Sequence, residues 1–308
     1  MTACSEEDRS AETAAAAISL PQVYTVNYPL AFFAERIAGE SVRVVFPAPP
    51  DVDPAYWSPT PETVADYQQA DLILLNGAGY AAWIQRATLS PSRLVDTSAA
   101  LAEQLIPVHD AVTHRHGPGG DHSHQLTAFT TWLNMEFAIG QARAVFNSLV
   151  GLRPDKEAEL REHLNELEIE LGNIDKRLKI VAKRIGNQPL LFSHPVYQYL
   201  MQRYGLNGRS LHWEPHEMPG NERWRELSAV LVTHAAAWMI WEDEPLPNIS
   251  DRLKRMGIES IVFRPCGNRP ANGNFARVML ENVVALEQAF PETAFSSVTD
   301  RVVTPARN

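Results

Sequence analysis

The chain has 308 residues, of which 45% are hydrophobic and 21% charged, and its formal net charge at pH 7 is -10. This composition is ordinary for a globular protein, and the negative charge argues against nucleic acid or an anionic membrane as the main partner. No stretch approaches the ~20 apolar residues that a membrane-spanning helix needs.

The first third of the chain predicts alternating strands and helices. Short β-rich or apolar runs predict strands, and apolar residues spaced by three and four predict helices. The expected strands are 23–28, 42–46 and 72–75, and the expected helices are 30–37, 60–70 and one that holds Trp83. This order predicts a parallel sheet with helices on both of its faces.

A long helix is expected in the middle of the chain. A shorter helix is predicted over 133–149, and residues 155–185 then form a highly charged run without an internal proline. Apolar residues recur through this run at helical spacing: Leu160, Leu164, Leu167, Leu171, Ile174, Leu178 and Val181. A helix of about 30 residues is about 45 Å long, which is enough to cross a whole lobe.

The last third predicts a second set of strands and helices. The expected strands are 189–192, 237–241 and 261–263, and the expected helices are 196–204, 249–256 and 275–290. The predicted fold class is therefore α/β, with two Rossmann-like lobes built on parallel sheets, one long rigid helix linking them and a cleft between them. The expected division is an N-terminal tether (1–21), an N-terminal lobe (22–150), the linking helix (151–187) and a C-terminal lobe (188–308).

Histidines are concentrated in one short segment, which we call the His-rich loop (residues 109–124). Two His-x-His pairs, His114 with His116 and His122 with His124, flank a turn of three glycines and a proline. Neutral imidazole is the commonest protein ligand for zinc and copper, and glycines allow one pair to fold back against the other. The loop is therefore a candidate metal site, with zinc the first choice and manganese or copper the alternatives.

The N-terminal residues Thr2, Ala3 and Cys4 read like the end of a bacterial lipoprotein signal. This pattern predicts lipidation at Cys4 and a location in the periplasm or on the extracytoplasmic face of a bacterial membrane. The acidic, alanine-rich residues 5–17 that follow read as a solvated tether.

Several motifs resemble one known family in the same order along the chain. These are Asp-Pro-Ala-Tyr-Trp-Ser-Pro-Thr-Pro at 53–61, Ala-Asp-Leu-Ile-Leu-Leu-Asn-Gly-Ala-Gly at 70–79, Trp-Leu-Asn at 132–134, Ser-His-Pro at 193–195 and Arg-Tyr-Gly-Leu at 203–206. They resemble the zinc/manganese solute-binding proteins of ABC transporters over roughly residues 22–290. The resemblance implies an ion-transport receptor with a metal cleft between two lobes and a membrane permease as its partner. We expect the chain to be a monomer.

The chain departs from this family at the expected metal ligands. The resemblance places the four ligand positions at Ala55, Thr130, His194 and Arg264, and only His194 can ligate zinc. A fixed arginine would also repel a cation. The usual site of the family is therefore expected to be absent as such.

Two replacements for that site remain open. In the first, His114, His116, His122 and His124 either join His194 or form a separate site on the loop. In the second, the cleft binds an anion or a metal chelate beside Arg264. Core packing is the simpler explanation for the two tryptophans among the residues expected to face such a cleft, and an ion pair is the alternative for Arg264. The expected residues are Asn27, Tyr28, Tyr56, Trp57, Thr130, Trp132, His194 and Arg264.

Two further groups could assist. Cys266 lies beside the fourth ligand position, but a small buried hydrophobic side chain is the simpler interpretation. The donor-rich segment 212–217 is expected to be a surface loop, with a supporting or second-site role as the alternative.

Catalytic motifs are absent from the sequence, since it has no His-Glu-x-x-His, Gly-x-Ser-x-Gly or phosphate-binding loop. We therefore expect a binding protein and not an enzyme. The main expectation is the substrate-binding protein of a zinc importer, and the alternatives are a receptor for an anion or metal chelate and a metal-storage or delivery accessory protein.

Overall fold

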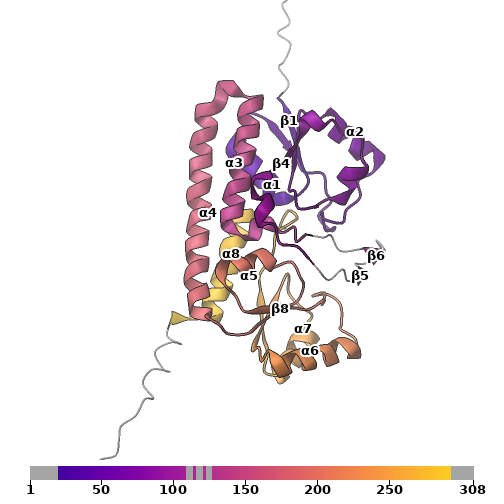
Figure 1. Cartoon of the computed structure of the whole chain (residues 1–308), viewed down its shortest axis with the longest axis vertical. Coiled ribbons are helices and arrows are strands. Elements are labelled where there is room, and N and C mark those ends of the chain that lie inside the picture. The colour runs from indigo at the N-terminus through magenta and orange to yellow at the C-terminus, as the bar shows by residue number, and fades with distance from the viewer. Residues whose placement is uncertain (1–19, 109–113, 116–120, 123–126, 293–308) are drawn as a thin grey trace, which may run out of the picture.

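Two parallel four-stranded sheets form the centres of two lobes (Figure 1). The structure is a computed structural model that describes residues 20–108, 114–115, 121–122 and 127–292. The N-terminal sheet has the order β2-β1-β3-β4, and the C-terminal sheet has the order β10-β9-β7-β8. Their strands are β1 (Gln22–Thr25), β2 (Arg43–Val45), β3 (Leu72–Leu75), β4 (Leu94–Asp96), β7 (Leu190–Phe192), β8 (Gly208–Ser210), β9 (Trp238–Trp241) and β10 (Glu259–Val262).

Helices surround both sheets. They are α1 (Tyr28–Ala38), α2 (Pro61–Gln69), α3 (Met135–Leu152), α4 (Glu157–Ile185), α5 (Gln198–Tyr204), α6 (Asn221–Thr233), α7 (Pro247–Arg255) and α8 (Phe275–Ala289). Helix α1 is buried on almost every face, and it begins where the Asn27 side chain accepts a hydrogen bond from the backbone N–H of Leu30. A side chain that caps a helix in this way satisfies a donor that the helix itself leaves unpaired.

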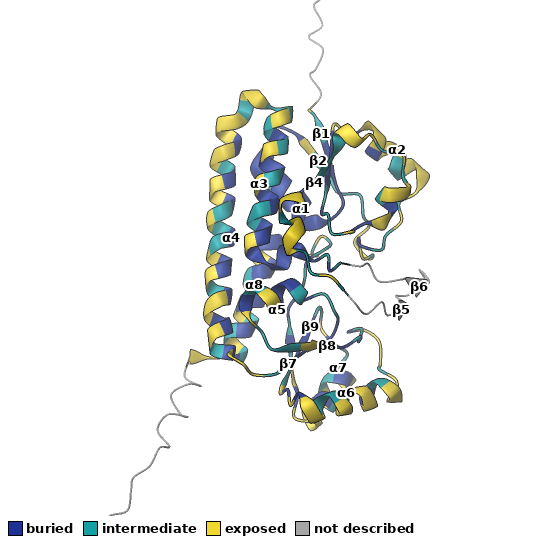
Figure 2. Ribbon diagram, viewed as in Figure 1, coloured by how far each residue is buried: buried dark blue, intermediate teal, exposed yellow. Residues whose placement is uncertain are grey.

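Helix α4 runs along both lobes and forms the spine of the molecule (Figure 1). It has 29 residues, so it is about 43 Å long. Its leucines at positions 160, 164, 167, 171 and 178 are buried, as the amphipathic spacing predicts. In Figure 2 the exposed residues of α4 lie on its outer side, and the buried residues face the other helices.

A buried carboxylate ties the C-terminal lobe to the spine. Asp175 on α4 accepts hydrogen bonds from Arg203 and Tyr204 on α5 and forms a 2.7 Å ion pair with Lys179. Arg203 also pairs with Glu136 at the start of α3. Because Asp175 is 8% exposed, its charge needs these partners, and the cluster fixes α5 against α3 and α4.

The α/β architecture predicted from the sequence is confirmed, with differences in detail. Strands β4 and β8 were not expected, because each is three residues long and lacks an apolar run. The turn that holds Trp83 is a 3-10 helix (Ala82–Arg86) and not an α-helix. Helix α6 was also missing from the expected elements.

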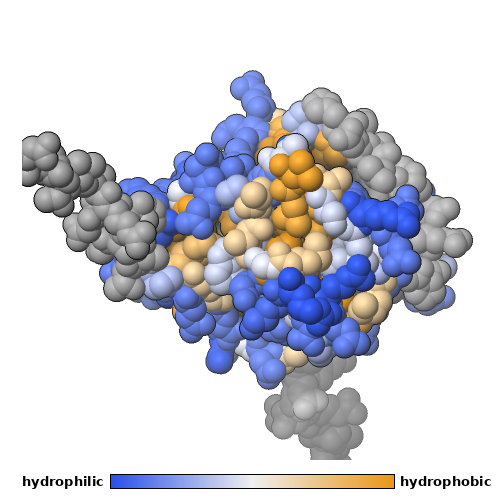
Figure 3. All heavy atoms as spheres, turned by 90° about the horizontal axis from the view of Figure 1, so that it is seen from below, coloured by the Kyte–Doolittle hydropathy of each residue, from blue (hydrophilic) through white to orange (hydrophobic). Residues whose placement is uncertain are grey.

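The surface carries mostly hydrophilic side chains around smaller apolar areas. Figure 3 shows one such apolar area at the centre of the face seen from below. Isolated exposed apolar residues, such as Ile169 on α4 and Val232 on α6, are normal at a protein surface. Within the described residues, no helix combines the length and apolar character needed to cross a membrane.

The packing of α4 against the core predicts how substitutions on this helix change stability. We expect Leu171→Ala to lower the free energy of unfolding by about 2–5 kcal/mol, because it leaves a cavity where α4 packs against the core. Ile169→Ala on the same helix is the matched control, since Ile169 is 66% exposed, and it should change stability by less than about 0.5 kcal/mol. Urea unfolding of both variants measures the difference, and equal losses would contradict this packing.

Candidate functional site

Three potential metal ligands meet at the carboxyl ends of adjacent strands in the C-terminal lobe. His194 follows β7, Glu214 lies in the loop after β8, and Glu242 directly follows β9. In the sheet β7 lies between β8 and β9, so the three strand ends are neighbours. The chain reverses its direction of strand addition between β7 and β9, and such a switch point is where open α/β sheets bind ligands.

The three side chains, called the metal trio below, are close enough to share one ion. Each offers one ligand atom, and these atoms all lie within 4.8 Å of one another. His194 Nδ1 lies 2.9 Å from Glu242 Oε1, and Nε2 lies 4.0 Å from Glu214 Oε1. The His194 side chain is 11% exposed, whereas those of Glu214 and Glu242 are 34% and 23% exposed. The trio therefore lies in a sheltered wall that the solvent still reaches.

Negative charge dominates the surroundings of His194. Burial by itself favours the neutral ring, but the hydrogen bond to Glu242 and the charges of Glu242, Glu214 and Asp53 outweigh it. The pKa of His194 is therefore raised above its ordinary value. The same field that holds a proton on the ring would attract a metal cation.

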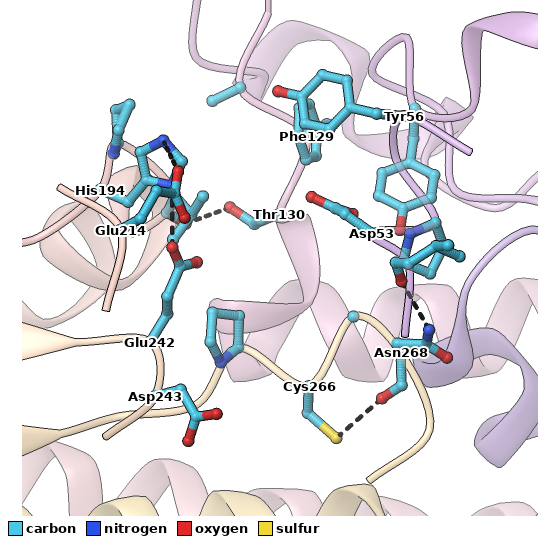
Figure 4. Close-up of a pocket in the computed structure, with 18 of the residues that line it drawn as sticks. Asp53, Tyr56, Phe129, Thr130, His194, Glu214, Glu242, Asp243, Cys266 and Asn268 are labelled. Atoms are coloured by element: carbon cyan, nitrogen blue, oxygen red, sulfur yellow. Dashed lines mark hydrogen bonds and ion pairs between the residues drawn. The ribbon is translucent and has the colours of Figure 1, made fainter. Parts of the chain in front are cut away.

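A large cavity of about 1210 Å³ separates the trio from the N-terminal lobe. Figure 4 shows His194, Glu214 and Glu242 on one side, Tyr56 and Asp53 on the other, and Phe129 between the two. The rings of Tyr56 and Phe129 meet edge to face at 6.2 Å. Carboxylates are frequent in the lining, whereas the lining residues of the described chain include no lysine or arginine.

The family ligand positions inferred from the sequence have the following surroundings. Ala55 is buried, its side chain has no atom that could bind a metal, and it is not part of the cavity lining. Thr130 does line the cavity, but its hydroxyl donates a hydrogen bond to the Val196 carbonyl. Arg264 is paired with Asp243 at 2.9 Å, which confirms the ion pair considered for it.

The expected lining of the cleft is partly wrong. Tyr56, Thr130 and Trp132 line the cavity, but Asn27, Tyr28, Trp57 and Arg264 do not. Asn27 caps α1 and donates a hydrogen bond to Asn76 at 3.0 Å, so it is fully buried in the core. Tyr28 lies in the first turn of α1 and is 2% exposed. Arg264 turns to Asp243 because a carboxylate there neutralises its charge.

The His-rich loop is described only in its two short strands, β5 (His114–Arg115) and β6 (Asp121–His122). These pair antiparallel, and the register places His114 directly opposite His122. His116 and His124 lie outside the described residues, and so does Cys4. The participation of the loop histidines in a site with His194, and the lipidation of Cys4, stay predictions.

The structure agrees with the interpretation of Cys266 and differs from that of segment 212–217. Cys266 is buried, and burial raises the pKa of its thiol to about 12, so it behaves as the small hydrophobic side chain that was expected. The donor-rich segment 212–217 is not simply a surface loop, because His212 and Glu214 line the cavity. The His212 ring meets the His194 ring edge to face at 6.0 Å.

Sequence reasoning missed Glu242 entirely. The available signal was its place immediately after the expected strand 237–241, where a parallel sheet presents side chains to a ligand. The order of strands in the sheet was needed to place Glu242 beside His194, and periodicity alone does not give that order.

Comparison with known proteins gives a family match over most of the chain. The model of the family described as "Zinc-uptake complex component A periplasmic" matches residues 23–289. Zinc-binding lipoprotein AdcA of Streptococcus pneumoniae is 23% identical over 277 residues, which is 86% of this chain but only 55% of AdcA. The high-affinity zinc uptake system protein ZnuA of Bacillus subtilis is 23% identical over 234 residues, covering 75% of this chain and 73% of that protein.

Solved structures confirm the fold of the chain. The Zn(II)-bound ZnuA-like domain of S. pneumoniae AdcA has a TM-score of 0.73 at 21% identity, and the match covers 88% of this chain and 99% of that one. The metal-dependent lipoprotein YcdH of B. subtilis has a TM-score of 0.72, with 88% and 98% covered. The chain is also similar to the manganese ABC transporter substrate-binding lipoprotein PsaA of S. pneumoniae, with 24% identity over 63% of this chain and 62% of PsaA.

The raised pKa of His194 predicts a pH-dependent contribution to stability when a chelator keeps the protein free of metal. Protonated His194 contributes its full stabilisation below the pKa of about 6.5 that a histidine has in the unfolded chain. This stabilisation is lost as pH rises through the higher pKa of His194 in the folded protein. The variant Glu242→Gln removes the main stabilising charge. We expect the melting temperature of the unaltered protein to exceed that of the variant by more at pH 6 than at pH 9. A difference that stays constant with pH would contradict this assignment.

Proposed function

We propose that this chain, which belongs to the zinc-uptake complex component A family, is the substrate-binding receptor of an ABC importer and carries Zn²⁺ on the metal trio. The observation that carries the proposal is the convergence of His194, Glu214 and Glu242 within 4.8 Å at the switch point of the C-terminal sheet. The ion is cargo, and the role of the protein is to bind it and not to catalyse a reaction.

The donor set suits a divalent transition metal. Zinc bonds to imidazole nitrogen at about 2.0–2.1 Å and to carboxylate oxygen at about 2.0–2.2 Å, usually with four ligands in total. The 4.0 Å between His194 Nε2 and Glu214 Oε1 needs only a small closure to bracket an ion at such bond lengths. Two carboxylates also balance both charges of the ion, which a site with Arg264 in place of an acid would not do.

Zinc is favoured over manganese on chemical grounds. An imidazole ligand suits zinc, and for mixed nitrogen and oxygen sites the affinity rises from manganese towards zinc. The printed names of AdcA and ZnuA specify zinc, whereas PsaA is named for manganese. We therefore expect Zn²⁺ to bind this chain more tightly than Mn²⁺, although a site with two carboxylates admits both.

The surrounding charge favours a cation over the anionic alternative. Asp51 and Asp53 line the cavity in addition to the two glutamates of the trio, whereas the charge of the lining residue Asp243 is matched by Arg264. The arginine that the anion hypothesis relied on is neutralised by Asp243 and lies outside the lining. An anion entering this cavity would be repelled at short range.

The family context supports the location and partner. We propose that the chain works outside the cytoplasmic membrane, in the periplasm or anchored by lipid at Cys4, and delivers zinc to a membrane permease as a monomer. These are features of the whole transport system, and the chain spans only about half the length of the pneumococcal AdcA that it matches.

Single substitutions in the metal trio test the proposed site. We expect His194→Ala and Glu214→Gln to weaken zinc binding by about 100-fold or more, because loss of even an orienting partner costs 10–100-fold. The matched control is Glu217→Gln, which changes an exposed carboxylate of the same loop that does not line the cavity. Isothermal titration calorimetry with ZnCl₂ measures all three, and unchanged affinity in both trio variants would contradict the site.

The His-rich loop needs its own test, because its contribution stays a prediction. Replacing His114, His116, His122 and His124 by alanine removes both His-x-His pairs. Since the three ligands of the proposed site all lie outside residues 109–124, we expect the variant to keep the tight zinc site and to lose only weaker additional zinc. Loss of tight zinc binding in this variant would instead show that the loop histidines and His194 share one site, which is one of the arrangements considered from the sequence.

A further inference from the structure

The two loops that carry the glutamates of the metal trio are tied to each other beside the ligands. Asp243 directly follows Glu242, and its Oδ2 lies 3.4 Å from Nε2 of His216, which belongs to the loop of the other glutamate. In the same two loops, the Leu246 N–H donates a 2.9 Å hydrogen bond to the Pro215 carbonyl. The loops after β8 and β9 are therefore joined both by side chains and by the backbone.

Asp243 receives further support from the loop after β10. Its Oδ1 accepts a 3.0 Å hydrogen bond from Arg264 Nε, and Arg264 Nη2 lies 2.9 Å from the same oxygen. The Glu244 N–H also donates to this oxygen at 2.9 Å. Hydrogen bonds between a guanidinium and a carboxylate are among the strong ones, because both partners are charged. We call Arg264, Asp243 and His216 the Asp243 cluster.

The backbone of Arg264 is itself fixed by a buried side chain of α8. Asn282 Oδ1 accepts a 2.8 Å hydrogen bond from the Arg264 N–H, and Asn282 Nδ2 donates one of 2.8 Å to the Arg264 carbonyl. Asn282 is 2% exposed, and α8 packs against α4. The Asp243 cluster is therefore anchored to the interior of the molecule through Arg264.

The metal trio needs such an anchor because its two carboxylates carry like charges. The ligand atoms of the trio all lie within 4.8 Å of one another, and carboxylates at this separation repel each other when no cation lies between them. Loops that are already held in the binding geometry lose less free energy to ordering when the ion arrives. In Figure 4 Asp243 lies beyond Glu242 as seen from His194, so the cluster supports the trio from behind.

We propose that Arg264 and Asp243 are positioning residues of the zinc site, which hold the loops after β8 and β9 at the separation that zinc coordination needs. This deepens the proposed function and rests on it. The arginine at the position where the family resemblance places an acidic ligand thus works behind the site and not inside it. Residues that orient metal ligands without touching the ion typically contribute about 10–100-fold to metal affinity.

The variant Arg264→Gln tests this inference through the sign of its effect. If the arginine acted only through its charge, its removal would strengthen the binding of a cation. We expect the reverse, with zinc affinity in isothermal titration calorimetry at least about tenfold weaker, because Asp243 loses its anchor. Arg264→Lys keeps a positive charge that can still pair with Asp243, so it should recover part of the affinity.

The matched control is Arg269→Gln, which removes the same charge from the same loop outside the Asp243 cluster. The Arg269 side chain is 51% exposed, pairs with Glu35 of the N-terminal lobe and does not line the cavity. This variant should keep zinc affinity within about twofold, because solvent and salt screen an exposed charge. The double variant Arg264→Gln with Asp243→Asn should bind zinc no more weakly than the weaker single variant, since the two residues act through each other.

The melting temperature of the chelator-treated protein separates positioning from a general loss of folding. An ion pair that the solvent reaches contributes little to stability, so we expect Arg264→Gln to lower this temperature no more than Arg269→Gln does. The loss should therefore appear in zinc affinity and not in the stability of the metal-free protein.

Unchanged or tighter zinc binding by Arg264→Gln would overturn the inference. It would leave the proposed zinc receptor intact if the unaltered protein binds zinc tightly and His194→Ala does not. A weakening that Arg269→Gln shares, or that comes with a lower melting temperature than in that control, would show a general effect of charge or folding and would also overturn the inference. If the unaltered protein fails to bind zinc, the proposed function fails and the inference fails with it.

Discussion

The packing of α4 along both lobes is the constraint on which the rest of the structure depends. One continuous helix contacts α1 and α3 beside the N-terminal sheet and α5 and α8 beside the C-terminal sheet. The Asp175 cluster fixes its C-terminal half to α5, and the loop after β10 reaches the N-terminal lobe through the 2.8 Å hydrogen bond from Trp132 to the Pro265 carbonyl. The cavity lies between the two lobes that this spine joins.

The two lobes use equivalent positions in different ways. In the N-terminal sheet the switch point lies between β1 and β3, where Asn27 and Asn76 are hydrogen-bonded to each other and buried. The remaining groups of these amides are also paired, because Asn27 Oδ1 accepts from the Leu30 N–H and Asn76 Nδ2 donates to the Phe129 carbonyl, so both side chains serve to hold the sheet to its neighbours. In the C-terminal sheet the same point holds an imidazole between two carboxylates, and all three side chains line the cavity. The cation site that we propose therefore lies in the C-terminal lobe.

Sequence patterns predict the fold well where side-chain periodicity is strong. The leucine spacing of α4 gave its length within two residues at the start, and the apolar run of β3 gave a strand buried on both faces. Strands β4 and β8 were missed because each has only three residues, which is too few to show a periodic pattern, and they pair with β3 and β7. The site shows the same limit. His194 follows from the family motif, but Glu214 and Glu242 reach it only through the order of strands in the sheet, a tertiary property that local periodicity does not encode.

The position of the bound ion tests the central claim most directly. A crystal of the zinc-loaded protein, measured at the zinc absorption edge, gives an anomalous difference map that locates the metal independently of any mutation. The account predicts one dominant peak about 2 Å from His194 and from the carboxylates of Glu214 and Glu242. A dominant peak among the histidines of residues 109–124, with none beside His194, would contradict it.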